Sequence, residues 1–355
     1  MLPSRYRTDS SHSTPGGFGS VLPVHDTYLD RPVLFKSMHD PANNVQLLAE
    51  IRGLSRARSR HVVEIYDVIR DVNNDVVGII IEKLTGPDYL NFHNQAATKP
   101  SEFLGLVYQI ATALADLHHA GIVHRDLKLD NMRESSSGVL KVFDFGISCE
   151  GTGYHTKENR GTLIYAAPEL YIHGVKITWH MDVYALGICC WALASNQIPA
   201  VLLEMPPQST GSAPSIGTVL PGLFPIEVIQ LLDSCLSVDQ SHRPSAATVS
   251  KALLRHLVKG KHRGIFVQGG VTIYELSIAK PNVKISIGGL GEIRVSYDGT
   301  SFLITFVSGD VYINNVALQV GMMLHDSCVL TFGAFHLGSD RQWIAFLSAY
   351  PELVL

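Results

Sequence analysis

The stretch that decides the fold is HRDLKLDN, residues 124–131, followed after a hairpin-like segment by DFG, residues 144–146. Transfer of a γ-phosphoryl group needs a carboxylate that orients a hydroxyl and accepts its proton, and oxygen ligands that hold Mg²⁺ against the phosphates. Asp126, Asn131 and Asp144 supply that set. Each alone would be an ordinary turn residue, but together in one short stretch they predict a site for phosphoryl transfer.

A glycine-rich stretch near the N-terminus supports this prediction. Residues 16–21, GGFGSV, precede a strand-like run, VLFK, that ends at Lys36. Closely spaced glycines let backbone N–H groups approach phosphate oxygens, and a lysine on the strand behind them supplies a fixed positive charge. A buried lysine needs a counter-charge, and Glu50, in the helical run 45–54, is the candidate. Alone, such a glycine-rich turn is more often only a hairpin.

With these residues in place, the sequence resembles the eukaryotic-like protein kinases over roughly residues 5 to 257. HRDLKLDN is similar to their catalytic loop, DFG to their magnesium-binding motif and VLFK to their strand-lysine motif. APE, residues 167–169, is similar to the end of their activation segment. Further matches are Gly161-Thr162, the run DVYALG at 182–187 and HRP at 242–244.

The resemblance implies a role for each matched residue. Asp126 would be the catalytic base, and Lys128 would neutralise charge on the γ-phosphoryl group. Asn131 and Asp144 would bind Mg²⁺, or Mn²⁺ in its place. Lys36, held by Glu50, would contact the α and β phosphates of ATP. The remaining ATP-binding residues that the resemblance implies are Gly16, Gly17, Gly19, Val21, Ile81, Glu82 and Leu84.

Other matched residues would have structural or regulatory roles. Asp182 would hold the catalytic-loop backbone from a buried central helix, and Arg243 would pair with Glu169. Arg125, before the base, would grip a phosphate on the activation segment, so the resemblance implies autophosphorylation. The regulatory candidates on that segment are Thr152, Tyr154, Thr156 and Thr162. The alternative is that this glycine-flanked segment is a mobile loop with solvated hydroxyls.

Two details indicate the acceptor. Lys128 and Thr162 are similar to the residues of the Ser/Thr branch, which predicts that the acceptors are serine and threonine hydroxyls of a protein substrate.

One feature departs from the family: the position of the first glycine of the phosphate loop is occupied by Thr14, with Pro15 after it. A stiffer loop entry should weaken nucleotide cradling only modestly. The alternative function is a pseudokinase scaffold, which the retained catalytic set disfavours.

The predicted fold class is α+β: a bilobal kinase fold over residues 1–258, with lobes of about 1–83 and 84–258, then a linker at 259–264. Between residues 102 and 118, apolar residues recur with a helical period, between Pro100 and Gly121. From residue 265 to 355, short β-branched and aromatic runs alternate with turn pairs, which predicts a small all-β sandwich.

This C-terminal region is similar to the closing half of a forkhead-associated domain, a β-sandwich that often binds phosphothreonine. The matching segments are 311–318, Gly321, Leu324, Asp326 and 331–333. Such domains capture phosphate with an arginine after an early glycine, whereas Gly288 is followed here by Gly289. We therefore expect phosphate binding to be lost, and the module to dock a partner protein or to brace the kinase.

Composition limits the remaining possibilities. The chain has 355 residues and a net charge of −4, so no global positive field attracts nucleic acid or an anionic membrane. Five scattered cysteines without metal-site spacing favour a reducing, cytoplasmic setting. The uncharged run 183–203 is long enough to span a bilayer, but polar residues inside it predict a buried helix and loop. We expect neither a nucleic-acid partner nor a membrane span.

Overall fold

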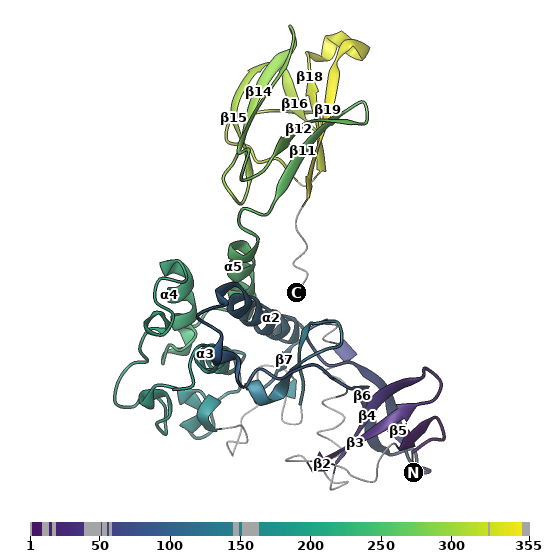
Figure 1. Cartoon of the computed structure of the whole chain (residues 1–355), viewed down its shortest axis with the longest axis vertical. Coiled ribbons are helices and arrows are strands. Elements are labelled where there is room, and N and C mark those ends of the chain that lie inside the picture. Colours follow the sequence, from purple (N-terminus) through teal and green to yellow (C-terminus); the bar gives the residue numbers. More distant parts are fainter. Residues whose placement is uncertain are drawn as a thin grey trace. The chain divides into compact units, whose positions relative to one another are not determined.

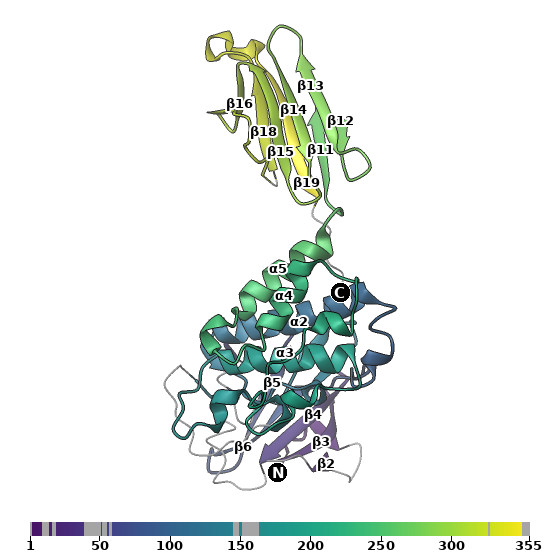
Figure 2. The same cartoon turned by 90° about the vertical axis from the view of Figure 1, so that its left-hand side faces the viewer.

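The computed structural model describes residues 2–8, 14–15, 19–38, 51, 55–56, 59–144, 149–150, 163–325 and 327–349. The chain divides into two compact units, with the boundary between Leu253 and Leu254. The first unit holds a sheet and a helical part, and the second is built mainly from strands (Figures 1 and 2). This architecture confirms the predicted fold class.

An antiparallel sheet opens the first unit. Its six described strands are β1 (Tyr6–Thr8), β2 (Thr14–Pro15), β3 (Gly19–Asp26), β4 (Arg31–Met38), β5 (Ile65–Arg70) and β6 (Val76–Glu82). They follow the order β1-β3-β4-β6-β5, with β2 paired to β3. Val24, Val33 and Ile80 form the centre of its small core. The β3–β4 hairpin places Val21 directly opposite Lys36, so the strand lysine is held by a continuous ladder.

Most of the rest of this unit is helical. Its described helices are α2 (Pro100–His119), α3 (His180–Ala194) and α4 (Ile226–Ser234), and α5 (Ala246–Val258) begins in it and continues past Leu253. The predicted apolar stripe lies on α2, which starts at Pro100, a favourable first residue, and stops before Gly121 with φ of 78°. Helix α3 is buried along nearly its whole length. No helix among the described residues is both long and apolar enough to cross a bilayer.

Two short strand pairs and several 3-10 turns connect these helices. The hairpin β8 (Met132–Glu134) and β9 (Leu140–Val142) follows the catalytic loop, and β7 (Ile122–Val123) pairs with β10 (Cys149–Glu150). The 3-10 turns of this unit lie at Phe92–Asn94, Leu129–Asn131, Leu163–Tyr165, Pro168–Tyr171, Ala200–Leu202, Ile216–Thr218 and Gln240–His242. Figure 1 shows β3–β6 at one end of the unit and α2–α4 at the other.

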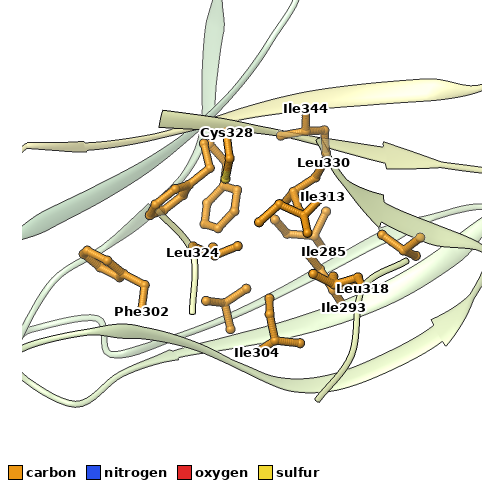
Figure 3. Close-up of a cluster of buried hydrophobic side chains, with 14 of the residues drawn as sticks. Ile285, Ile293, Phe302, Ile304, Ile313, Leu318, Leu324, Cys328, Leu330 and Ile344 are labelled. Atoms are coloured by element: carbon orange, nitrogen blue, oxygen red, sulfur yellow. The ribbon is translucent and has the colours of Figure 1, made fainter. Parts of the chain in front are cut away.

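The second unit is a β-sandwich of two sheets. Its strands are β11 (Arg263–Gln268), β12 (Val271–Leu276), β13 (Asn282–Ile287), β14 (Gly291–Tyr297), β15 (Phe302–Gly309), β16 (Val311–Ile313), β17 (Val316–Ala317), β18 (Ser327–Phe332) and β19 (Gln342–Ala349); a 3-10 segment, Phe335–Asp340, precedes β19. One sheet has the order β12-β11-β19-β18-β16-β17 and the other β13-β14-β15. Ile293 and Ile304 of one sheet face Leu330 and Ile344 of the other across an apolar core (Figure 3).

The boundary between the units differs from the expected one. The stretch 259–264 is not a separate linker: β11 already begins at Arg263, and Gly260 N donates to Gly299 O at 2.7 Å. His262 is buried, with its Nδ1 2.8 Å from the Tyr297 hydroxyl. These contacts place the basic stretch against the β14–β15 turn. The sandwich therefore starts several residues earlier than its strand pattern indicates.

Candidate active site

The catalytic loop is organised around Asp126. Lys128 Nζ donates to Asp126 Oδ2 at 2.9 Å. Asn131 Nδ2 donates to the Asp126 carbonyl at 2.8 Å and to Oδ2 at 3.1 Å. The 3-10 turn Leu129–Asn131 brings the amide back toward the carboxylate. A carboxylate held in this way keeps one orientation, which a group that accepts a proton from a bound hydroxyl requires.

The backbone of this loop is fixed from α3. Asp182 is fully buried, and its two oxygens accept from the backbone N–H groups of His124 and Arg125, each at 2.8 Å. His118 Nε2 lies 2.8 Å from the same carboxylate. Burial raises the pKa of the Asp182 carboxyl, but the hydrogen bond and electrostatic attraction of His118, the attraction of His124 and the backbone N–H of Arg125 together outweigh it. The pKa therefore lies below its usual value. Sequence reasoning anticipated the backbone contacts but missed His118.

Lys36 and Asp144 meet from opposite lobes. Lys36 Nζ donates to Asp144 Oδ1 at 3.0 Å, although 108 residues separate them in the chain. Desolvation raises the pKa of the Asp144 carboxyl, whereas the Lys36 ammonium lowers it by attraction and hydrogen bonding, and the net shift is downward. Asp144 has a φ of 66°, a left-handed backbone conformation, two residues after the end of β9. The carboxylate is therefore ionised near neutral pH and faces a fixed positive charge.

Three of the predicted ATP-binding residues lie at the end of strand β6. Ile81 and Glu82 are its last residues, and Leu84 follows it. Glu82 Oε2 accepts from Lys141 Nζ at 2.6 Å, and Glu64 Oε1 lies 3.4 Å from the same ammonium. Sequence reasoning missed Lys141, because alternation along Leu140–Val142 assigns a lysine there to solvent. A buried neighbour of opposite charge gives no signal in the sequence.

The predicted ion pair between Glu169 and Arg243 is present and buried. Arg243 donates to Glu169 through both terminal nitrogens, at 2.7 and 2.8 Å. Its Nε and remaining N–H groups donate to the carbonyls of Ser237, His180 and Val238. All five guanidinium donors are therefore used, which fits a structural role at the end of the segment that carries Glu169.

Several predicted residues lie outside the described part of the chain: Gly16, Gly17, Glu50, Thr152, Tyr154, Thr156 and Thr162. Gly19 is described only as the first residue of β3. The structure pairs Lys36 with Asp144, and it groups Lys128 and Asn131 around Asp126. Phe143 N donates to Asn131 O at 3.0 Å, so the residue before Asp144 is bonded to the second group.

The donor set fits a magnesium nucleotide. Because the Asn131 amide nitrogen is directed at Asp126, its oxygen is the atom suited to a metal, and Asp144 adds a carboxylate. Mg²⁺ takes one or two protein oxygen ligands and completes its shell with phosphates and water. Among the described residues, no group of three or more His, Cys, Asp or Glu side chains could hold a metal. Oxygen donors of this kind suit a divalent cation such as Mg²⁺ or Mn²⁺ that is bound together with the phosphates of a nucleotide.

Comparison with known proteins also indicates a protein that handles a nucleotide and its phosphates. The family model described as "Protein kinase domain" matches residues 14–254, more than half of the chain. The serine/threonine-protein kinase PrkC of Bacillus subtilis is 32% identical over 195 residues, which cover 52% of this chain and 29% of that protein. The probable serine/threonine-protein kinase PknB of Lactococcus lactis is 31% identical over 194 residues, covering 52% and 30%. The serine/threonine-protein kinases drp72 protein of Corynebacterium efficiens is 29% identical over 231 residues, covering 59% and 44%. The matches thus span less than half the length of these relatives.

Proposed function

The chain belongs to the protein kinase family, and on that premise we propose that it transfers the γ-phosphoryl group of ATP to serine and threonine hydroxyls of protein substrates. The observation that carries the proposal is the convergence of Lys36 and Asp144 on one side and Asp126 with Lys128 and Asn131 on the other. Phosphoryl transfer depends on positioning and electrostatics, and this set supplies both.

In the proposed reaction, Asp126 orients the acceptor hydroxyl and takes its proton. Lys128, 2.9 Å from that carboxylate, neutralises charge that develops on the transferred group. Lys36 contacts the α and β phosphates, and Asn131 and Asp144 hold Mg²⁺. Bound Mg²⁺ would draw charge from the phosphate oxygens. The buried Asp182 keeps the loop that carries Asp126 in one conformation throughout.

The finer features remain part of the proposal. The Ser/Thr acceptor rests on Lys128 and Thr162, and the printed names of the relatives agree with it. We also propose that Arg125, which precedes the base, binds a phosphate on the segment between Asp144 and Glu169 and that autophosphorylation controls this segment. We further propose a reducing, cytoplasmic setting. The sandwich, which resembles a forkhead-associated domain, would dock a partner protein or brace the kinase.

The direct test is phosphate transfer from labelled ATP to myelin basic protein and to the chain itself, with Mg²⁺ present. Asp126→Asn and Lys36→Ala should each lower the rate by about 10² to 10⁴, because each removes a group that acts on the reacting phosphate or hydroxyl. Lys99→Ala, which removes an exposed lysine paired with Glu102, serves as a matched control and should leave the rate unchanged.

Two outcomes would contradict this function. A wild-type chain that binds ATP but transfers no phosphate to any protein would favour the pseudokinase scaffold. Equal incorporation of phosphate into wild type and Asp126→Asn would show that the label comes from a contaminating kinase. Mapping of phosphopeptides in the two proteins tests autophosphorylation in the same experiment.

A further inference from the structure

Three buried polar residues outside the catalytic set gather at the strand β9. They are His61, Gln109 and Lys141, with exposed fractions of 1%, 5% and 6%. Lys141 belongs to β9 itself, whereas His61 precedes β5 and Gln109 lies in α2. Buried polar side chains are costly unless they are hydrogen-bonded. The groups on β9 to which Gln109 and His61 are hydrogen-bonded therefore indicate the role of these two side chains.

Gln109 and His61 bond the two backbone groups of one residue. Gln109 Oε1 accepts from Leu140 N at 2.9 Å, and His61 Nδ1 lies 3.1 Å from Leu140 O. Arg60 Nε donates to His61 Nε2 at 3.1 Å. An arginine Nε can only donate, so His61 Nε2 accepts and Nδ1 carries the proton toward Leu140 O. The imidazole is thereby held neutral in a single tautomer.

The backbone of residues 61–63 is also hydrogen-bonded to β9. Val142 N donates to His61 O at 2.9 Å, and Val63 N donates to Val142 O at 3.0 Å. Val62 and Val142 form a parallel bridge. Four hydrogen bonds therefore hold the edge of β9 that faces away from β8, two from side chains and two from the backbone.

We propose that Gln109 and His61 are positioning residues for Asp144, a role that rests on the proposed kinase function. Asp144 lies two residues beyond Val142 and has a φ of 66°. A left-handed conformation in a residue other than glycine is unfavourable and persists only where its surroundings determine it. Phe143 N donates to Asn131 O at 3.0 Å on the side of the catalytic loop. The hydrogen bonds to Leu140 and Val142 fix the chain just before Phe143. Together, these contacts would hold the Asp144 carboxylate in the orientation in which it can bind Mg²⁺.

The test measures nucleotide binding rather than turnover. A fluorescent ATP analogue is titrated into the full chain in EDTA and in Mg²⁺, and the gain in affinity on adding Mg²⁺ is compared between variants. Gln109→Met removes the acceptor at nearly constant volume. We expect it to bind metal-free nucleotide within about twofold of wild type, but to lose about tenfold of the Mg²⁺-dependent gain, which corresponds to about 1.4 kcal/mol. Gln109→Glu keeps an acceptor oxygen and should recover most of the gain.

A matched control lies one turn further along α2. Thr112 Oγ1 is bonded to Ser250 Oγ of α5 at 2.8 Å and donates to Tyr108 O. Thr112→Val should lower the unfolding temperature without changing the Mg²⁺-dependent gain. If Gln109→Met does not fold, His61→Phe takes its place, because its ring has no nitrogen that could donate to Leu140 O, and the same loss is expected.

The outcomes separate this inference from the proposed function. A wild type that gains affinity with Mg²⁺, beside a Gln109→Met variant with an equal gain, would overturn the positioning role and leave the kinase function intact. Equal losses in Gln109→Met and Thr112→Val would also overturn it, because the effect would then be general loosening. A wild type that binds no nucleotide with Mg²⁺ would overturn the function and the inference together.

Discussion

At the scale of single residues, the site depends on backbone conformations that neighbours enforce. Arg125 and Asp144 both have positive φ, 70° and 66°. Neither is a glycine, so each conformation costs free energy that nearby bonds must offset. Asp182 holds the N–H of Arg125, and Lys36 holds the carboxylate of Asp144. The motifs predicted that Asp182 holds the loop backbone, but they did not predict the pairing of Lys36 with Asp144, and no local pattern could show these backbone conformations.

Replacing Asp182 tests this dependence. Asp182→Ala leaves the buried N–H groups of His124 and Arg125 without their acceptor and His118 without its carboxylate. We expect the free energy of unfolding of the first unit to fall by about 3 kcal/mol, and transfer activity to fall with it. Calorimetry of the full chain separates the two units' transitions. Asp75→Ala, at an exposed carboxyl, should change stability by less than about 0.5 kcal/mol; a similar loss in both variants would refute the assignment.

Acid stability has a separate residue-level origin in Asp26. Arg5 donates to both of its oxygens, at 2.8 and 2.7 Å, and this pairing lowers the pKa of the Asp26 carboxyl from 3.8 to about 2. A depressed folded-state pKa adds stability above the unfolded value, which is lost as pH falls toward the folded value. The difference in unfolding free energy between wild type and Asp26→Asn should therefore shrink between about pH 4 and pH 2. A difference that stays constant in urea titrations over that range would contradict this origin.

At the scale of elements, periodicity predicted much of the fold. The apolar stripe of α2 and the strand runs of the sandwich appear where expected, because each buries one continuous face. No hydrophobic pattern in the sequence predicted that the Lys141 ammonium on β9 is buried. Its burial depends on Glu82 and Glu64, which reach it from the other lobe. Contacts between elements distant in sequence are what a local pattern does not contain.

The ion pair between β9 and β6 gives an element-scale prediction. Lys141→Met should lower the free energy of unfolding by about 2 to 3 kcal/mol, because the largely buried Glu82 carboxylate loses its partner. It should also raise the KM for ATP, since Glu82 is one of the predicted ATP-binding residues. The double variant Lys141→Met/Glu82→Leu should regain most of the stability, because a packed apolar pair can replace a buried ion pair. Additive losses in the double variant, measured by urea unfolding, would count against this account.

The β16–β17 turn offers a second element-scale prediction. Asn314 and Asn315 both have positive φ, 47° and 68°, the conformation of a tight hairpin turn that favours Asn and Gly. Asn314 Oδ1 also accepts from Val329 N at 2.9 Å. Asn315→Gly should leave stability unchanged or raise it by about 0.5 kcal/mol, whereas Asn314→Ala should lower it by about 1 to 2 kcal/mol. The sandwich transition in calorimetry measures both, and the reverse order would refute the turn assignment.

At the scale of the whole molecule, the chain is built from two units with separate cores. The sandwich core, which includes Phe266, Phe332 and Phe346, lies entirely within the second unit. The change from mixed to all-β patterning predicted this division, but with a linker at 259–264 it placed the start of the sandwich at residue 265. The contacts of Gly260 with Gly299 and of His262 with Tyr297 set the observed start of the sandwich. Single polar contacts of this kind leave no periodic pattern in the sequence.

The position of that boundary is testable by truncation. A fragment that begins at Lys259 keeps the bond from Gly260 N to Gly299 O and the contact of His262 with Tyr297, so it should unfold near the temperature of the sandwich transition in the full chain. A fragment that begins at Gly264 lacks both and leaves the buried Tyr297 hydroxyl short of a partner. It should lose about 2 kcal/mol, or about 1 for each of two hydrogen bonds. His262→Phe in the full chain keeps the ring volume and should reproduce about half of the loss. Two fragments of equal stability would show that the strands alone define the unit.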